Sequence, residues 1–178
     1  QEERDNFNNQ IILIKGARAF QFEYIAGFLQ KQSHSTILEV DLDAMVHNLN
    51  HFRSLTDAHI AVMVKAFSYG SGSREIASLL QYHRVDYLMV AFADEGVTLR
   101  EAGITMPIVV LNADSDSFDL MLDYRLEPEI YSRSSLQSFA ETVRRNGETD
   151  YPIHIKLDTG MHRLGFERQD IDPLIDAL

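Results

Sequence analysis

The chain has 178 residues, 45% of them hydrophobic and 24% charged, as is usual for a globular domain with a sizeable core. Its formal net charge of -11 argues against a nucleic-acid partner or an anionic membrane, because clustered Lys and Arg bind phosphate surfaces. The lack of cysteine excludes disulfides, thiolate metal sites and cysteine nucleophiles, and no apolar run reaches the roughly 18 residues of a membrane helix. We therefore expect a cytoplasmic protein.

The N-terminal segment predicts a small unit of its own. Residues 10–31 have the pattern of one strand followed by one amphipathic helix. The polar stretch at residues 30–35 then has the composition of a linker. This pattern predicts a boundary near His34, with a remnant of a preceding domain plus linker at residues 1–34 and a second domain at residues 35–178.

The second predicted domain opens with a strand and a helix. Thr36 to Leu42 alternates between apolar and polar residues, which is typical of a strand. Asp43 is then the expected N-cap of a helix that carries Leu49, Phe52 and Leu55.

From residue 60 onward, short apolar runs alternate with amphipathic segments. The pattern predicts five strands, at residues 60–64, 87–91, 108–111, 128–131 and 153–157, and helices around residues 76–80, 97–103 and 132–147, with a last amphipathic stretch at 171–178. Such alternation implies an α/β fold with parallel strands and right-handed crossovers. A complete (β/α)8 TIM-type barrel takes about 250 residues, so the prediction is an incomplete barrel of about five β/α units. Periodicity alone also allows an open doubly wound sheet.

Two of the predicted strands end in a lysine. Lys65 follows the apolar run that starts at Ile60 and precedes a glycine-rich turn, while Lys156 lies near the end of the last predicted strand, shortly before Arg163. Barrel enzymes carry their chemistry at the C-terminal ends of the strands, so two cationic strand ends suggest an anionic cofactor. Lys65 has the chemistry to form a Schiff base. The alternative is a barrel lysine that pairs with a neighbouring carboxylate.

Two motifs connect these lysines to a known family. They are Lys65-Ala66-x-x-Tyr69-Gly70-x-Gly72 and the stretch Lys-Leu-Asp-Thr-Gly-Met-His-Arg-Leu-Gly from Lys156 to Gly165. Together they resemble the pyridoxal-phosphate-dependent alanine racemase family, and the resemblance runs from about Thr36 to Leu178. It implies the N-terminal part of an alanine racemase barrel, which interconverts L-alanine and D-alanine for peptidoglycan synthesis and is a homodimer in the parent protein.

The resemblance also implies roles for individual residues. Lys65 corresponds to the catalytic lysine that binds pyridoxal phosphate covalently, and Tyr69 to a hydroxyl donor to the cofactor phosphate. Arg163 corresponds to the arginine that contacts the cofactor's phenolic oxygen and the substrate carboxylate. Lys156 matches a lysine that is often carbamylated in this family, where the carbamate holds the arginine in place. Ser68 stands where alanine is more common.

Other polar residues near these motifs are expected to have supporting roles. Asp158 and His162 flank Arg163 and are residue types that serve as acid/base pairs or metal ligands, but the remaining histidines lack ligand-like spacing, so no metal site is predicted. Asp94 and Glu95 follow the second predicted strand of the barrel and are expected to cap the next helix.

The resemblance implies that the rest of the family's site lies outside these 178 residues. The resemblance places the opposite-face tyrosine base in a second domain, so we expect this chain alone to have little or no racemase activity. The unpaired edges of the first and last barrel strands predict self-association. Two other readings stay open: a single-domain barrel that binds the cofactor for homeostasis, and a non-catalytic half-barrel fragment.

The first thirty or so residues resemble a different protein. The stretch from Ile11 to Leu29 is similar to the C-terminal end of UDP-N-acetylmuramoyl-tripeptide:D-alanyl-D-alanine ligase. This similarity implies a bifunctional ligase/racemase fusion, in which D-alanine is produced beside its point of use. The alternative is an N-terminal extension peculiar to this protein.

Overall fold

The computed structural model describes residues 39–69 and 72–178, except for the side chains of Phe67 and Tyr69. Val40–Leu178 forms one compact unit. The predicted N-terminal strand and helix, and the boundary near His34, lie outside the described residues and stay predictions. Among the described residues, no helix combines the length and the hydropathy needed to cross a bilayer.

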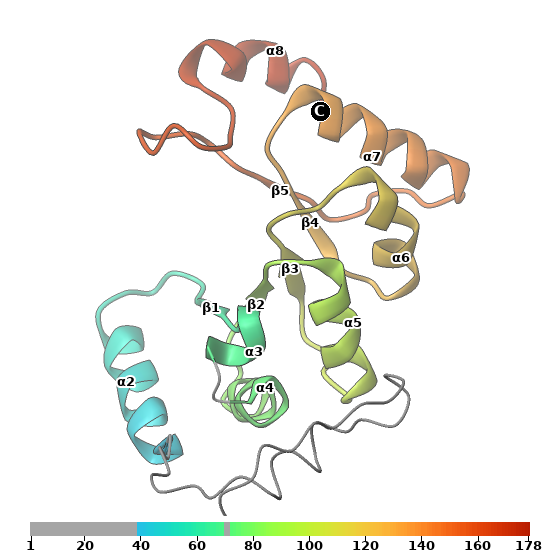
Figure 1. Ribbon diagram of the computed structural model, residues 1–178. Coiled ribbons are helices and arrows are strands. Elements are labelled where there is room, and N and C mark those ends of the chain that lie inside the picture. Colours follow the sequence, from blue (N-terminus) through green and yellow to red (C-terminus); the bar gives the residue numbers. More distant parts are fainter. Residues whose placement is uncertain (1–38, 70–71) are drawn as a thin grey trace, which may run out of the picture. The chain divides into compact units, whose positions relative to one another are not determined.

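A parallel sheet forms the centre of this unit (Figure 1). The strands are β1 (Ala61–Met63), β2 (Tyr87–Val90), β3 (Ile108–Val110), β4 (Glu127–Ile130) and β5 (His154–Ile155). They lie in the order β1-β2-β3-β4-β5, and every neighbouring pair is parallel. All five predicted strands are therefore confirmed, although β5 is shorter than expected. Sequential order is typical of neighbouring strands in a (β/α)8 barrel, whereas a doubly wound sheet reverses direction at a switch point.

Helices connect the strands along the whole unit. They are α2 (Leu42–Ser54), α3 (Lys65–Tyr69), α4 (Ser73–Tyr82), α5 (Ala93–Glu101), α6 (Phe118–Asp123), α7 (Arg133–Arg145) and α8 (Ile171–Ile175), with 3-10 turns at Ser115–Ser117 and Arg168–Asp170. The helices predicted around residues 76–80, 97–103 and 132–147 are confirmed as α4, α5 and α7. The sequence pattern missed α3 and α6, because five and six residues are too few for a clear helical period.

The start of α2 differs from the prediction. Asp41, not Asp43, is the N-cap, because its extended backbone places the carboxylate oxygen 3.0 Å from the backbone nitrogen of Ala44. Leu42 is therefore helical, and the prediction that it ends a strand is wrong. Phe52 is 63% exposed, so the expected apolar face of this helix is only partly covered.

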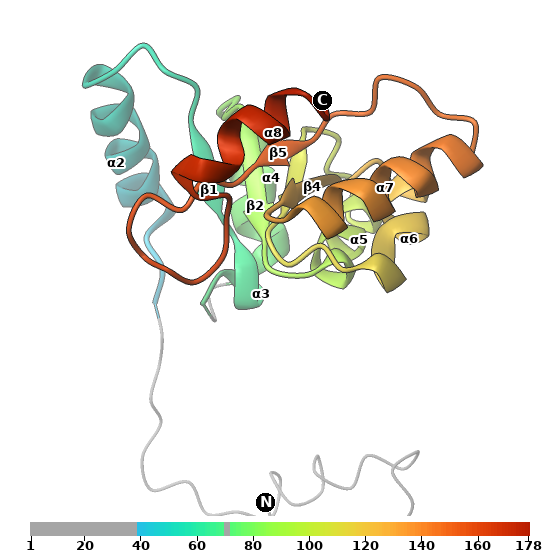
Figure 2. The same cartoon turned by 90° about the horizontal axis from the view of Figure 1, so that it is seen from above.

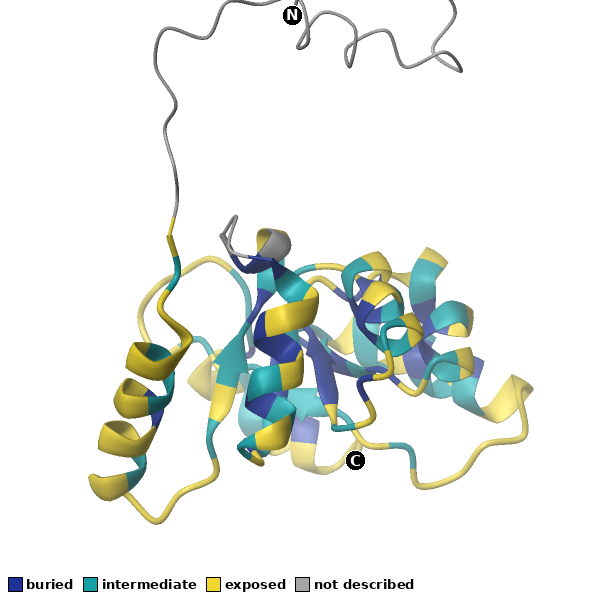
Figure 3. Ribbon diagram, turned by 90° about the horizontal axis from the view of Figure 1, so that it is seen from below, coloured by how far each residue is buried: buried dark blue, intermediate teal, exposed yellow. Residues whose placement is uncertain are grey.

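The core lies between the sheet and its helices. In β2, Leu88 and Val90 are fully buried, while Tyr87 and Met89, which alternate with them, are only half-buried. Figure 3 shows buried positions gathered on the strands and on the helix faces toward them. The alternation leaves a second sheet face that is less covered.

Aromatic side chains join α6 and α7 to this core. Figures 1 and 2 show α6 beside α7, where the rings of Phe118 and Phe139 meet edge to face with centroids 5.0 Å apart. Tyr151 packs against Phe139 at 5.6 Å, and its hydroxyl lies 3.1 Å and 2.9 Å from two backbone carbonyls. These contacts set the approach of the chain to β5.

Candidate active site

Lys65 lies at the C-terminal end of β1. The preceding residue, Val64, is 2% exposed and donates its backbone N–H to the carbonyl of Met89 at 2.9 Å. This bond extends the β1 ladder by one residue, and Lys65 then opens α3. The prediction that Lys65 stands at the C-terminal end of a strand is confirmed, although the residues of β1 itself are exposed or half-buried. Its half-buried side chain starts at the edge where parallel α/β proteins carry ligands.

The turn after Lys65 has an unusual backbone. Ala66 and Ser68 both have a φ of 51°, in the left-handed region that non-glycine residues seldom adopt. Such conformations cost about 1–3 kcal/mol each and persist only where the surroundings hold them. The residues directly after β1 form the short helix α3, and Gly70 and Ser71 of the predicted glycine-rich turn lie outside the described residues. The side chain of Tyr69 lies outside the described residues.

Ser68 adds an unpaired hydroxyl to this turn. The residue is 7% exposed, and within the described part of the chain its Oγ has no hydrogen-bond partner. A buried hydroxyl without a partner costs about 1–3 kcal/mol, so such a group calls for an explanation. Ser68 is thus a buried polar group three residues after Lys65 whose hydroxyl has no partner among the described residues.

Glu95 ties this turn to the end of the next strand. Its Oε2 accepts the backbone N–H of Phe92 at 3.2 Å, so the expected capping of α5 is confirmed for this residue. Its Oε1 also accepts the backbone N–H of Ala66 at 2.6 Å. The second bond joins residues 29 positions apart, and no sequence pattern predicted it.

Lys156 follows β5 directly and forms an ion pair. Its Nζ lies 2.9 Å from Oε2 of Glu129, and the two side chains are 24% and 12% exposed. A barrel lysine paired with a carboxylate was the alternative considered for Lys65. The structure shows such a pair at Lys156. Across the described ranges, no hydrogen bond or ion pair joins Lys65 to Lys156 or Arg163.

Arg163 is exposed in a loop that is closed at its base. The backbone of Asp158 pairs with that of Phe166 at 2.9 Å, and the Asp158 carboxylate accepts the N–H groups of Gly160 and His162 at 2.9 and 3.0 Å. These donors hold the pKa of Asp158 below its ordinary value, with backbone Gly160 as the largest cause. Asp158 therefore has the supporting role that was expected, as an anchor of the loop that carries Arg163.

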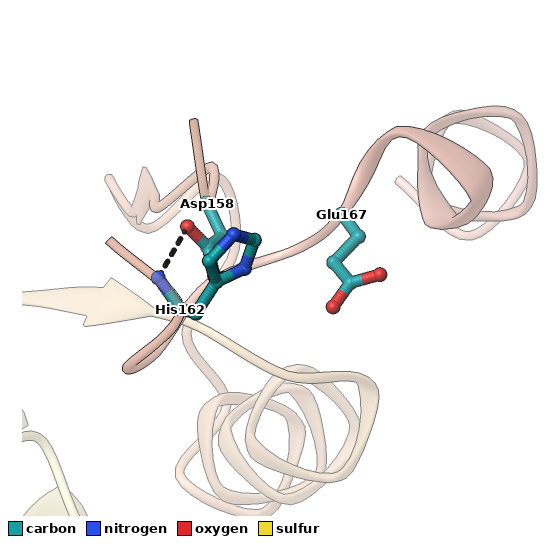
Figure 4. A group of neighbouring side chains, drawn as sticks. All are labelled: Asp158, His162 and Glu167. Atoms are coloured by element: carbon teal, nitrogen blue, oxygen red, sulfur yellow. Dashed lines mark hydrogen bonds and ion pairs between the residues drawn. The ribbon is translucent and has the colours of Figure 1, made fainter. Parts of the chain in front are cut away.

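Three possible metal ligands converge beside this loop. Asp158, His162 and Glu167 place their ligand atoms within 4.8 Å of one another, one ligand more than the sequence suggested (Figure 4). The Asp158 carboxylate is already occupied by backbone donors, and Figure 4 shows Glu167 on a separate stretch of chain. Exposed acidic groups often lie this close without a metal, so we assign none here.

The comparisons with known proteins agree with this architecture. The family model "Alanine racemase, N-terminal domain" matches residues 40–178. The chain belongs to the alanine racemase family. It is 36% identical over 132 residues to the alanine racemase of Synechocystis sp. and 38% identical over 136 residues to that of Thermodesulfovibrio yellowstonii.

Solved structures of alanine racemases share this fold. The alanine racemase of Clostridium difficile 630 in complex with cycloserine matches with a TM-score of 0.74 and 34% identity, over 82% of this chain and 41% of that one. The two sequence matches cover 72% and 71% of this chain, but only 35% and 36% of the relatives. The chain thus spans about a third of the length of the curated alanine racemases that it matches.

Several polar residues of this alanine racemase domain escaped the sequence analysis. Glu127 and Glu129 lie in β4, and Glu127 accepts a 2.6 Å contact from Nε2 of His154 in β5. The ring of His154 also meets Tyr87 edge to face, with centroids 5.4 Å apart. The strand was predicted to start only at Pro128, so Glu127 fell outside it. The period-two pattern Glu-Pro-Glu-Ile was the available signal.

Proposed function

We propose that this domain is the cofactor-binding part of a pyridoxal-phosphate-dependent alanine racemase, which interconverts L-alanine and D-alanine for peptidoglycan synthesis. One observation carries the proposal: Lys65 stands at the C-terminal end of β1, directly after buried Val64, in a chain whose family match covers residues 40–178. A primary amine at this edge of a parallel sheet is suited to covalent binding of an aldehyde.

The other donors fit the same cofactor. Pyridoxal phosphate carries an aldehyde and a phosphate. The segment after β1 carries the amine of Lys65 and the buried hydroxyl of Ser68, which has no hydrogen-bond partner among the described residues. We infer that Lys65 would hold the cofactor, that Tyr69 would donate to its phosphate, and that Arg163 would bind the phenolic oxygen and the substrate carboxylate. When bound, the cofactor withdraws electrons from the substrate α-carbon and makes loss of its proton feasible. Nζ of Lys65 would take up and return that proton on one face.

Carbamylation of Lys156 is a separate part of the proposal. The ammonium of Lys156 pairs with Glu129 at 2.9 Å, and the amine must lose its proton before it can react with carbon dioxide. The carbamate would be an anion beside the Glu129 carboxylate, so the modified side chain would have to leave Glu129. An opposite charge near Arg163 would favour that move.

Further parts of the proposal concern the whole protein and residues 1–34. We propose a cytoplasmic homodimer with a complete barrel and a second domain that supplies the opposite-face base. We further propose that residues 1–34 are a ligase-like remnant and linker, that residues 35–178 belong to the racemase barrel, and that the chain alone is inactive as a racemase. A D-alanine assay tests this last point, and activity above a Lys65→Ala control contradicts it.

Site-specific labelling tests the central claim. The chain is incubated with pyridoxal phosphate, reduced with borohydride and digested, and the labelled lysine is located by peptide mass. Lys15, Lys31 and Lys156 serve as internal controls for non-specific modification. We expect the label on Lys65 in clear excess over the other three. Equal labelling of all four lysines, or none on Lys65, contradicts cofactor binding by this chain.

A further inference from the structure

The carboxylate of Glu95 accepts hydrogen bonds from two different segments of the chain. Its Oε1 lies 2.6 Å from the backbone nitrogen of Ala66, and its Oε2 lies 2.7 Å from that of Ala91 and 3.2 Å from that of Phe92. Hydrogen bonds to an ionised acceptor are about twice as strong as neutral ones. Both oxygens of this single side chain are therefore used.

Capping of α5 explains only half of this arrangement. Ala91 and Phe92 immediately precede the helix, and a glutamate in the first turn commonly accepts their N–H groups. Ala66 is 29 residues away, and its nitrogen belongs to the peptide bond that joins it to Lys65. Glu95 thus connects the end of β2 directly to the backbone of the candidate cofactor lysine.

The same bond explains how a strained backbone is maintained. Ala66 has a φ of 51°, which alanine adopts only when the surrounding structure imposes it. The short bond from its N–H to Glu95 fixes the orientation of the Lys65–Ala66 peptide, and so the point from which the Lys65 side chain emerges.

We propose that Glu95 is a positioning residue for Lys65: its carboxylate holds the peptide after the lysine against the end of β2, so that the amine is presented to the cofactor. This inference rests on the proposed function. Glutamine has the same length but only one acceptor oxygen, so it can serve Ala66 or the helix start but not both. Aspartate keeps both acceptors and the charge on a side chain shorter by one methylene.

Asp86 provides a matched control at the opposite end of the same strand pair. Its Oδ2 accepts the backbone N–H of Ile60 at 2.7 Å, and its Oδ1 lies 2.8 Å from Nδ1 of His59. It therefore ties the start of β1 to β2, as Glu95 ties the end. Asp86→Asn weakens a comparable carboxylate tie without touching the peptide of Lys65.

The experiment compares the full chain with its Glu95→Gln, Glu95→Asp and Asp86→Asn variants in three measurements. The first is amide hydrogen exchange of Ala66. The second is the pH profile of Lys65 acetylation by acetic anhydride, relative to Lys156. The third is the borohydride-stabilised pyridoxal phosphate label on Lys65. A urea titration of each variant confirms that it is folded.

We expect Glu95→Gln to speed exchange of the Ala66 amide about tenfold, as for loss of one hydrogen bond, and to reduce the cofactor label by a similar factor. Glu95→Gln should also change how the rate of Lys65 acetylation, relative to that of Lys156, depends on pH. In all three measurements, Glu95→Asp should give values between those of the wild type and of Glu95→Gln. Asp86→Asn should give wild-type values in all three.

The outcomes separate this inference from the proposed function. If Glu95→Gln matches Asp86→Asn at Ala66 and Lys65, Glu95 is only a structural tie and the inference is wrong, even if the label on Lys65 forms normally. If the wild-type chain takes no label but Glu95→Gln still changes Ala66 exchange and Lys65 acetylation, the positioning role stands and cofactor binding by this chain is refuted.

Discussion

Replacing Arg100 with methionine should destabilise the fold strongly. The guanidinium donates four hydrogen bonds to backbone carbonyls: to Tyr124 at 2.9 Å, Ile104 at 2.9 Å, Met106 at 2.7 Å and Arg125 at 2.8 Å. Arg100 thus joins the end of α5 to the loops that lead into β3 and β4. Burial lowers the pKa of Arg100, but a guanidinium remains charged in proteins.

The expected loss in free energy of unfolding follows from these four hydrogen bonds. A hydrogen bond to a charged group contributes about 1.5–3 kcal/mol, so a simple sum gives about 6–12 kcal/mol. Carbonyls released at half-exposed loops can bind water instead, which reduces the expected loss to about 3–5 kcal/mol. Typical domains have unfolding free energies of about 5–15 kcal/mol, so this change removes a large share.

Urea unfolding followed by circular dichroism measures the effect. Arg145→Met is the matched control, because Arg145 pairs with Asp119 at 2.7 Å while both side chains are more than 60% exposed, at 63% and 62%. Such surface pairs contribute about 0–1 kcal/mol. If Arg100→Met loses no more free energy of unfolding than Arg145→Met does, the reasoning about the backbone carbonyls is wrong.

Three further changes test other parts of the structure. Gly165→Ala should destabilise the Arg163 loop by about 2 kcal/mol or more, because Gly165 has a φ of 129° and a Cβ there would lie 2.7 Å from the nitrogen of Asp158. An unfolding free energy in urea equal to that of the wild type would contradict this. The pKa of Asp158 is lowered from its ordinary value of 3.8, so the ionised carboxylate stabilises the fold fully above pH 3.8, and this stabilisation is lost as the pH falls through the folded-state pKa. In Asp158→Asn, the free energy of unfolding should therefore depend less steeply on pH in acid. Burial raises the pKa of Tyr151 to about 12, so its hydroxyl is neutral at both pH 6 and pH 9. Tyr151→Phe should therefore lower the free energy of unfolding by about 1–2 kcal/mol at either pH. A loss that differs between the two pH values would contradict a neutral, buried hydroxyl. Because β1 and β5 end the strand order, self-association is expected at tens of micromolar, and a monodisperse monomer in light-scattering chromatography would contradict it.

The sequence by itself determined the elements with a clear local period. The apolar runs at β1 to β5 and the helical spacing in α4, α5 and α7 were all predicted within a few residues. The regular alternation of strands and helices also determined that the sheet is parallel. The position of Lys65 followed in the same way, because it directly follows an apolar run that was predicted to be a strand.

Only the tertiary structure decided which side chains meet. Glu95 reaches the amide of Ala66 29 residues away, and Lys156 pairs with Glu129 27 residues away on the neighbouring strand. The Lys156–Glu129 pair depends on strand register, because a shift by one residue would turn the side chain to the other face of the sheet. The Glu95–Ala66 bond depends on how α5 and α3 are placed at the ends of neighbouring strands. The periodicity of apolar residues indicates which face of a helix or strand is buried. It does not indicate which residue of the next helix or strand lies opposite that face. For that reason the motifs could be placed on strand ends from the sequence, whereas the contacts that hold Lys65 and Lys156 in position required the assembled sheet.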